Sequence, residues 1–162
     1  MPQEAPTLHM ICGKIASGKS TLTYKLGLEP GTIVISEDDW LRALFADELK
    51  TIGDYVRCAT KLQTVMAPHV SSVLSAGVSV VLDFQANTID ARNWMRDIFE
   101  QADASHILHV LDVPDKVCLA RLQARNAQGD HPFSVTDEQF WQISSHFVAP
   151  SPDEKFNIVL HR

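Results

Sequence analysis

The chain has 162 residues, of which 45% are hydrophobic, and it carries a formal net charge of -6 at pH 7. This length suits one domain with a full core and leaves none for a second, so we expect a single domain over 1–162. Attachment to a nucleic-acid backbone or an anionic membrane depends on an excess of Lys and Arg, which is missing here. These features favour a small-molecule partner and argue against nucleic acid or membrane.

The first ten residues, MPQEAPTLHM, are acidic and contain proline, whereas a secretion signal would be basic and then apolar. No apolar run approaches the roughly 20 residues of a membrane span. Cys12, Cys58 and Cys118 form an odd set without a close pair, which suits a reducing compartment. We therefore expect a cytoplasmic protein, either a monomer or a weak dimer.

Short β-rich runs alternate with helix-length amphipathic segments along the chain. We expect strands over 7–12, 32–36, 78–83, 106–113 and 156–161. The runs 32–36 and 78–83 are almost continuously apolar, as in strands that are covered on both faces of a parallel sheet. The alternation predicts an α/β fold, a three-layer α/β/α sandwich with right-handed crossovers.

The helical segments carry recognisable starts. We expect helices over 20–27, 38–49, 54–76, 89–102, 114–126 and 137–147. Ser36 and Thr88 are suitable N-caps, Pro114 suits the first position of a helix, and Thr136 to Gln139 form a capping box. Pro68 lies well inside the third segment, which predicts a kink or two shorter helices there.

The first expected strand and helix are joined by GKIASGKS, residues 13–20, which fit the phosphate-binding pattern G-x-x-x-x-G-K-[ST]. Glycines let the backbone curl so that several N–H groups point at a phosphate chain, and the following helix adds its positive N-terminal end. The alternative is an ordinary glycine-rich turn, but the position between a strand and a helix favours phosphate binding. The residues expected to hold a nucleoside triphosphate, ATP or GTP, are Gly13, Lys14, Ala16, Ser17, Gly18, Lys19, Ser20 and Thr21.

Within this loop Lys19 supplies a charge at the β- and γ-phosphates, and the Ser20 hydroxyl can ligate Mg²⁺. Asp83 ends the strand 78–83 at the edge of the sheet where ligands bind, and it is the acid expected to order the magnesium. The alternative for Asp83 is a cap on the following turn.

Glu37, Asp38 and Asp39 follow the second strand at the same edge of the sheet. Three adjacent acids repel one another, and a carboxylate that faces the γ-phosphate can accept the proton of an attacking hydroxyl. Asp38 is the best candidate for this catalytic base. The alternative is that the acids only favour the N-terminus of the helix that follows.

Arg121 and Arg125 are four residues apart, hence on one helix face, just before the polar loop 127–133. Arginines in such a lid, around 121–133, can neutralise the charge that develops on a transferring phosphoryl group. Solvated surface arginines are the alternative. Trp40 and Arg42 are candidate substrate contacts beside the acids, although packing and surface roles are open to them. His106 and His109 point to opposite faces of their strand and make a poor metal pair.

The segments GKIASGKST, ISEDDWLRALF, VVLDFQANT and LDVPDKVCLARLQARN resemble the compact P-loop kinases related to polynucleotide 5'-kinase, chloramphenicol phosphotransferase, gluconate kinase and zeta toxin. The resemblance is closest to bacterial ATP-binding proteins called predicted kinases. It implies a P-loop NTPase fold with a five-stranded parallel sheet in the order 2-3-1-4-5. It also implies that Asp38 is the general base and that Arg121 or Arg125 is the lid arginine.

Two positions depart from the polynucleotide kinase pattern. Arg42 is shifted by one residue from the arginine that grips nucleic-acid phosphate in that branch, and Lys14 is an extra cation inside the loop. With the acidic net charge, the shift argues against a polynucleotide substrate. The pattern therefore favours an ATP- and Mg²⁺-dependent phosphotransferase that acts on a hydroxyl of a small molecule.

Two alternatives are an ATPase that acts as a switch and a nucleotide-binding regulatory module without turnover. An enclosed second pocket lined by 37–45 and 84–88 would favour the kinase, and an exposed partner-binding patch beside the loop would favour the alternatives.

Overall fold

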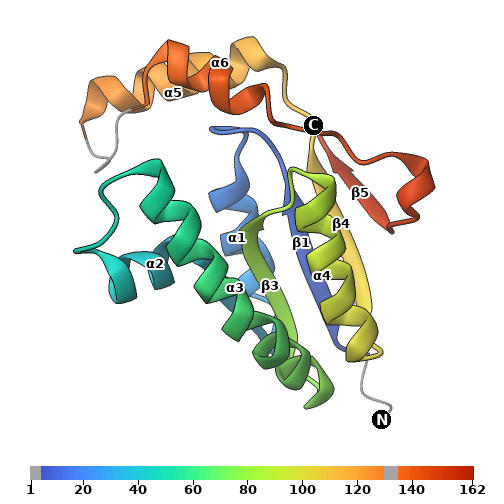
Figure 1. Ribbon diagram of the computed structural model, residues 1–162. Coiled ribbons are helices and arrows are strands. Elements are labelled where there is room, and N and C mark those ends of the chain that lie inside the picture. Colours follow the sequence, from blue (N-terminus) through green and yellow to red (C-terminus); the bar gives the residue numbers. More distant parts are fainter. Residues whose placement is uncertain (1–4, 130–134) are drawn as a thin grey trace.

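A computed structural model describes residues 5–129 and 135–162. The described chain contains a five-stranded parallel sheet in the order β2-β3-β1-β4-β5 (Figure 1). The strands are β1 (Thr7–Cys12), β2 (Thr32–Ser36), β3 (Ser79–Gln85), β4 (Ser105–Leu111) and β5 (Ile158–His161). The helices are α1 (Lys19–Gly27), α2 (Glu37–Phe45), α3 (Ile52–Ser75), α4 (Ile89–Gln101), α5 (Asp115–Gln128) and α6 (Asp137–Ser144), with a short 3₁₀ turn η1 (Pro152–Glu154).

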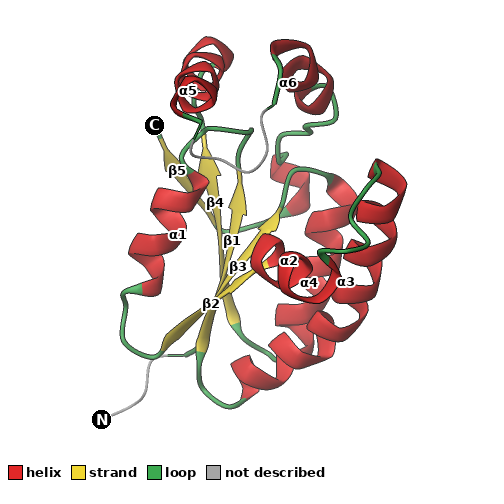
Figure 2. Cartoon of the chain, turned by 90° about the vertical axis from the view of Figure 1, so that its left-hand side faces the viewer, coloured by secondary structure: helices red, strands yellow, loops and turns green. Residues whose placement is uncertain are grey.

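Helices cover both faces of the sheet. Figure 2 shows α1 on one face, α3 and α4 on the other, and the pair α5 and α6 above the carboxyl ends of the strands. The predicted α/β class, the parallel sheet and the strand order 2-3-1-4-5 are therefore confirmed. Because the strands are parallel, every strand-to-helix connection at this edge faces the same space, and α5 and α6 bound that space from above.

Two groups of apolar side chains hold the layers together. The larger group packs α3 and α4 on β1 and β3, and it includes Leu8, Met10, Leu82, Met66, Val70 and Met95, all at most 1% exposed. The smaller group joins α5 to α6 through Cys118, Leu122 and Phe140, and Ile15 and Ala16 of the loop after β1 pack against it. The upper helix pair is thus fastened to the loop itself.

The predicted caps are present. Ser36, Thr88 and Thr136 each accept a hydrogen bond from the backbone three residues on, and Thr136 forms the full capping box with Gln139. Pro114 precedes α5 as its N-cap, one position before the predicted one. The Ser and Thr caps each satisfy an N–H group that the helix itself leaves unpaired, whereas Pro114 makes no such bond.

Several element boundaries differ from prediction, and both β4, which ends at Leu111, and β5, which begins at Ile158, are shorter than expected. The helix expected over 38–49 ends at Phe45, where the N–H groups of Glu48 and Leu49 donate to the Phe45 carbonyl in a closing turn. The segment 54–76 is one helix across Pro68, so the division into two helices does not occur; buried side chains on both sides of the proline hold it to the sheet. β3 continues past Asp83 to Gln85, which pairs with Ile11.

The last two helices also end at positions other than the predicted ones. α5 extends to Gln128, whereas α6 ends at Ser144 and not at residue 147. Residues 130–133 of the predicted polar loop and lid lie outside the described ranges.

Three histidines on neighbouring strands form a chain of hydrogen bonds. The Nδ1 of His9 lies 2.9 Å from the Nε2 of His109, and the Nδ1 of His109 lies 2.9 Å from the Nε2 of His161. His106 lies on the opposite face of β4 and stacks on Phe99 at 4.1 Å, so the predicted separation of His106 and His109 is confirmed. Burial and repulsion by its two partners lower the pKa of His109 to about 4.

The three cysteines are buried and free. Among the described residues, no helix is both long and apolar enough to span a membrane.

Candidate active site

The conformation of the loop between β1 and α1 explains why glycine is needed at both Gly13 and Gly18. A Cβ on Gly13 would lie 2.5 Å from the Oγ of Ser17 and 3.0 Å from the Cβ of Leu111, so no larger residue fits. Gly18 has a φ of 104°, which favours glycine. Ala16 also has a left-handed φ, 60°, at a cost of roughly 1 kcal/mol or more. Backbone strain of this kind is common in ligand-binding loops.

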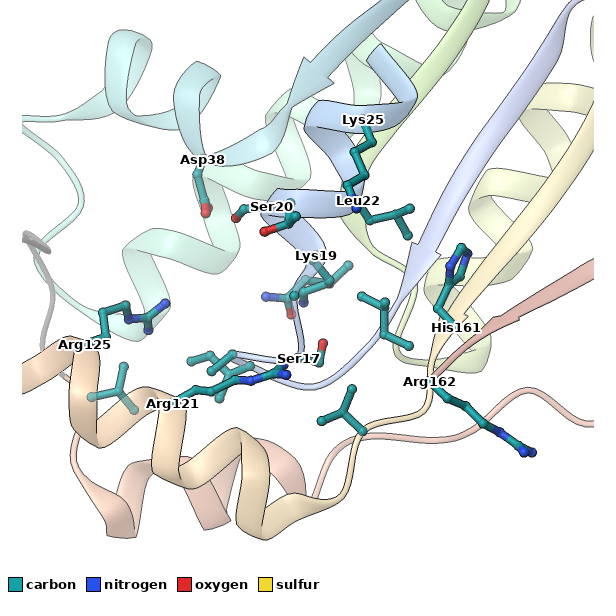
Figure 3. A pocket seen from close by; sticks show the side chains of 18 residues that line it. Ser17, Lys19, Ser20, Leu22, Lys25, Asp38, Arg121, Arg125, His161 and Arg162 are labelled. Carbon is teal, nitrogen blue, oxygen red and sulfur yellow. The ribbon is translucent and has the colours of Figure 1, made fainter. Parts of the chain in front are cut away.

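A cavity of about 860 Å³ opens over this loop (Figure 3). Residues 15–22 border it, Asp38 lines it from α2, and Arg121 and Arg125 line it from α5. His161 and Arg162 lie at the far side from Asp38. The structure thus brings together Ala16, Ser17, Gly18, Lys19, Ser20, Thr21, Asp38, Arg121 and Arg125, all of them sequence-predicted site residues.

Lys19 lines this cavity, Asp83 lines a neighbouring one, and the two side chains shift each other's pKa. Burial lowers the pKa of Lys19, and the negative charge of Asp83 partly offsets this by raising it. Burial also raises the pKa of Asp83. The positive charge of Lys19 lowers this pKa, and the negative charges of Asp38 and Asp39 raise it further. The Lys19 ammonium therefore partly offsets the mutual repulsion of the carboxylates near it.

The three consecutive acids separate at the start of α2. Glu37 is only 9% exposed and accepts a hydrogen bond from the Oη of Tyr55 at 2.9 Å, and burial raises its pKa. Asp38 lines the main cavity. Asp39 lines a neighbouring space of about 460 Å³ together with Asp83. Among the three acids, Asp38 is the one on the cavity wall.

The residues at this point fit a magnesium ion that is shared with a nucleotide. Ser20 borders the spaces that contain Asp38 and Asp83. Within the described part of the chain, no group of three His, Cys, Asp or Glu side chains forms a complete metal site. Mg²⁺ commonly takes one or two protein ligands and completes its shell with phosphates and water. Ser20 and Asp83 would hold it.

The arginines of α5 face the loop. The Nη1 of Arg121 lies 4.0 Å from the position that a Cβ on Gly18 would occupy. The Nε of Arg125 is buried and has no hydrogen-bond partner among the described residues. A buried donor without a partner costs about 1 to 3 kcal/mol.

Trp40 and Arg42 lie exposed on α2. Neither borders the cavities described in this section. Their assignment to the substrate stays a prediction.

Asn87, which the sequence patterns did not reveal, holds the start of the loop. Its Oδ1 accepts from the N–H of Gly13 and its Nδ2 donates to the carbonyl of Gly13, both at 2.9 Å. The backbone of Gly13 is therefore occupied by protein, and Gly13 is absent from the cavity wall. The available signal was the position of Asn87 just beyond β3, next to β1 in the sheet.

Lys14 is also directed away from the predicted phosphate site. Its Nζ donates to the Oδ1 of Asp115 at 2.7 Å and lies 5.4 Å from the centre of the Phe147 ring. Lys14 is absent from the wall of the main cavity. The side chain connects the loop to the start of α5 and to the segment after α6.

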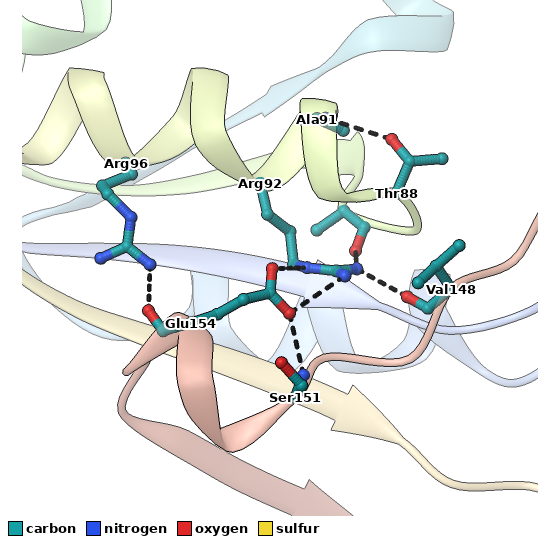
Figure 4. Close-up of polar contacts among 8 residues, drawn as sticks. Thr88, Ala91, Arg92, Arg96, Val148, Ser151 and Glu154 are labelled. Atoms are coloured by element: carbon teal, nitrogen blue, oxygen red, sulfur yellow. Dashed lines mark hydrogen bonds and ion pairs between the residues drawn. The ribbon is translucent and has the colours of Figure 1, made fainter.

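The buried side chain of Arg92 hydrogen-bonds to three segments of the chain near the site (Figure 4). The fully buried Arg92 bonds the Glu154 carboxylate at 2.8 and 3.3 Å, and donates to the carbonyls of Ala86 and Val148. The N–H of Val148 in turn donates to the carbonyl of Asn87 at 2.9 Å. Arg92 thereby joins the end of β3 to the segments that follow α6.

The arrangement can bind a phosphate chain through loop amides, an ammonium and a hydroxyl. It also holds a carboxylate and two guanidinium groups where charge and protons would move. These are the parts that phosphoryl transfer requires.

Comparison with known proteins identifies the family of the chain and solved structures with a similar fold. Residues 8–150 match the sequence profile of the family described as AAA domain. No curated protein matches the sequence.

Solved structures share the fold at low sequence identity. A kinase candidate from Chloroflexus aurantiacus is 18% identical with a TM-score of 0.74 over 99% of this chain and 86% of its own. The APS kinase of Mycobacterium tuberculosis, solved with AMPPNP and APS, is 20% identical with a TM-score of 0.61 over 98% and 90%. A gluconokinase from Sinorhizobium meliloti is 15% identical with a TM-score of 0.60 over 98% and 84%. At these identities the likeness concerns the fold alone.

Proposed function

Because the chain belongs to the AAA domain family and its phosphate loop shares one cavity with a carboxylate, we propose that it is a kinase. It transfers the γ-phosphate of ATP or GTP to a hydroxyl of a small molecule. The observation that carries the proposal is the position of Asp38 on the wall of the cavity that Lys19 and Arg125 also line.

Each wall of the cavity has a role in the transfer. The loop amides and Lys19 hold the phosphate chain, and Arg125 or Arg121 neutralises the charge that grows on the transferring group. Asp38 accepts the proton of the attacking hydroxyl. A magnesium ion, when bound at Ser20 and Asp83, supplies further positive charge to the phosphates.

The kinase names of the similar structures support the proposal, since gluconokinase and APS kinase are among them. The three free buried cysteines fit the cytoplasmic location that we also propose, with a monomer or weak dimer as the working form.

The direct test is ADP formation from MgATP, measured against a panel of hydroxyl-bearing metabolites, antibiotics and nucleosides. We expect at least one acceptor to raise ADP formation above basal hydrolysis and to gain a phosphate. An unstimulated basal rate across a broad panel would favour the ATPase switch, and no turnover at all would favour the binding module.

A second measurement tests the loop. MgATP should raise the thermal stability of the protein, because it binds the folded state preferentially. Lys19→Ala should weaken that shift by removing the charge at the β- and γ-phosphates. An unchanged shift would contradict phosphate binding at this loop.

The predicted second pocket between 37–45 and 84–88 has a partial counterpart. A smaller cavity is lined by Gln85, Asn87 and Thr88, but its opposite wall comes from α6 and the residues just after it, and not from α2. This cavity adjoins the main one through Ile15 and Gln85, which line both.

A further inference from the structure

Lys14, the extra cation inside the phosphate loop, has no role in the proposed transfer, although the contacts of its side chain are well defined. Its Nζ lies 2.7 Å from the Oδ1 of Asp115, and the two side chains are 24% and 38% exposed. The centre of the Phe147 ring, from the segment after α6, lies 5.4 Å from the same nitrogen. A charged hydrogen bond that is partly shielded from water holds its partners in a defined geometry. Lys14 therefore fixes Asp115, the first residue of α5.

The loop also holds α5 at a second place, near the middle of the helix. The two loop residues after Lys14, Ile15 and Ala16, pack there against an apolar cluster. The cluster contains Cys118 and Leu122 of α5, which are fully buried. Apolar burial is non-directional. The cluster therefore keeps the helix close to the loop but leaves α5 and α6, which share it, able to tilt about this contact.

The positions along α5 make the helix a lever with two equal arms. Cys118 lies three residues after Asp115, and Leu122 lies three residues before Arg125. At about 1.5 Å per residue, each arm from the middle of the cluster is about 7.5 Å long. A tilt that displaces Asp115 therefore displaces Arg125 by a similar distance in the opposite direction.

Arg125 is the arginine that depends most on this geometry. It lines the main cavity together with Lys19 and Asp38, and its Nε is buried (Figure 3). Catalytic groups tolerate little displacement, since a shift of about 1 Å can cost about 10²-fold in rate. Arg121 lies beside the middle of the cluster, so the same tilt displaces its backbone far less.

From these contacts we infer that Lys14 is a positioning residue for phosphoryl transfer: by holding Asp115, it sets the tilt of α5 and thereby places Arg125 at the transferring group. This inference rests on the proposed kinase function, in which Arg125 neutralises charge on that group. The pair of Lys14 and Asp115 also contributes to stability. A positioning role differs from a purely structural one because it acts on turnover only while Arg125 is present.

The first test measures ADP formation at saturating MgATP, and the Kd of MgATP, in Lys14→Met and Asp115→Ala. We expect kcat to fall about tenfold and Kd to stay within about twofold, because only the transition state depends on the position of Arg125. Lys14→Arg keeps the charged hydrogen bond and should retain most of the turnover. Lys116→Met is the matched control at an exposed position next to Asp115 and should behave as the wild type.

A comparison of backgrounds separates positioning from structure. In an Arg125→Ala background, Lys14→Met should change turnover by less than about twofold, since the effects of residues that act through one another do not add. In an Arg121→Ala background, it should still lower turnover about tenfold. A loss of the same size in both backgrounds would make Lys14 purely structural, and the inference would be wrong.

A binding measurement provides a readout besides turnover. MgADP with aluminium fluoride imitates the phosphoryl group during transfer, so Lys14→Met should weaken its binding about tenfold and leave the binding of MgADP alone unchanged. Calorimetry gives both affinities, and thermal unfolding shows that each variant is folded. If Lys14→Met does not fold, Asp115→Ala takes its place in every comparison.

The outcomes keep the two proposals apart. If the wild type forms no ADP from MgATP, with or without an acceptor, the kinase proposal fails and this inference fails with it. If the wild type turns over and Lys14→Met binds the aluminium fluoride complex equally well, the kinase stands and the inference alone is wrong. If Lys14→Met is folded but loses MgATP binding, Lys14 belongs to the phosphates and the positioning role is overturned.

Discussion

The phosphate loop has two sides that differ in how their polar groups are satisfied. On the side toward the main cavity, the Oγ of Ser17 and the Nε of Arg125 are buried without partners among the described residues. On the other side, Asn87 pairs both backbone groups of Gly13, and Asp115 pairs Lys14. We call these the ligand side and the anchor side.

Under the proposed function, the difference separates groups that the protein itself pairs from groups that a ligand would pair. Folding leaves few buried polar groups unpaired, because each costs about 1 to 3 kcal/mol. On the anchor side, Gly13 and Lys14 are paired by other protein groups, so these contacts should determine stability. The ligand side is incomplete, so its residues should determine turnover. Each prediction below tests one side of this division.

The largest effect is expected on the ligand side, at Asp38. Asp38→Asn keeps the size of the side chain and removes the proton acceptor, so acceptor phosphorylation should fall by about 10² to 10⁴. Folding and ATP affinity should persist, and slow hydrolysis by water can survive. Rates of transfer and hydrolysis in the variant are the measurement.

Asp47→Asn, in the turn after α2, is the control and should keep full activity. Equal loss of transfer and hydrolysis in Asp38→Asn would indicate metal positioning, and wild-type transfer would exclude Asp38 as the base.

The next largest effect is expected on the anchor side, at Arg92. Arg92→Met removes the bond to Glu154 and leaves the carbonyls of Ala86 and Val148 unpaired. Breaking a buried ion pair in this way typically costs about 3 to 5 kcal/mol of unfolding free energy. Chemical denaturation measures the loss.

Arg57→Met is the matched control, because Arg57 is 45% exposed and its contacts with Glu48 and Asp54 are at the surface. It should cost less than about 1 kcal/mol. Similar losses in the two variants would mean that Arg92 does not anchor the segments around the loop.

Arg125 tests the ligand side again. Arg125→Ala should leave nucleotide affinity within a few fold and lower turnover about 10²-fold, since a charge that engages mainly in the transition state changes kcat. Nucleotide binding and steady-state kinetics are measured together. Loss of affinity with unchanged turnover would make Arg125 a ground-state anchor and pass the catalytic role to Arg121.

The smallest effect concerns the histidine chain across β1, β4 and β5. The pKa of His109 is lowered from 6.5 to about 4, so the unfolded chain binds a proton first as the pH falls. Stability is complete above the unfolded value, declines between it and the folded value, and is lost below both. Between about pH 7.5 and about pH 5 the contribution of His109 falls by roughly 2 kcal/mol.

His109→Phe should therefore be less sensitive to acid than the wild type in chemical denaturation. His69→Gln changes an exposed histidine of α3 and should follow the wild type. If the stability of His109→Phe and of the wild type changed equally with pH, the three histidines would not titrate in this range.

The parts of the molecule that were predicted correctly depend on short stretches of sequence. The loop over 13–20 and the caps at Ser36, Thr88 and Thr136 were all identified from spacing. Their geometry involves residues at most a few positions apart, and local backbone preferences determine it. The strand order was expected from the resemblance, and the sheet confirms it.

The parts that were missed involve partners far apart along the chain. Asn87 lies 74 positions from Gly13, Asp115 lies 101 from Lys14, and Glu154 lies 62 from Arg92. The sequence offers many acids and amides for each of these roles, and no spacing distinguishes the right one. The placement of β3 and β4 on either side of β1 decides it.

The sequence by itself therefore determined that this protein has a phosphate loop, a neighbouring acid and the strands and helices to hold them. Only the tertiary structure decided that Lys14 faces away from the phosphates, that Glu37 is buried on Tyr55, and that a side cavity adjoins the loop. A hydrogen bond needs two groups within about 3 Å. The packing of elements that are distant in sequence brings such groups that close, and the periodicity of the sequence does not indicate which groups will meet.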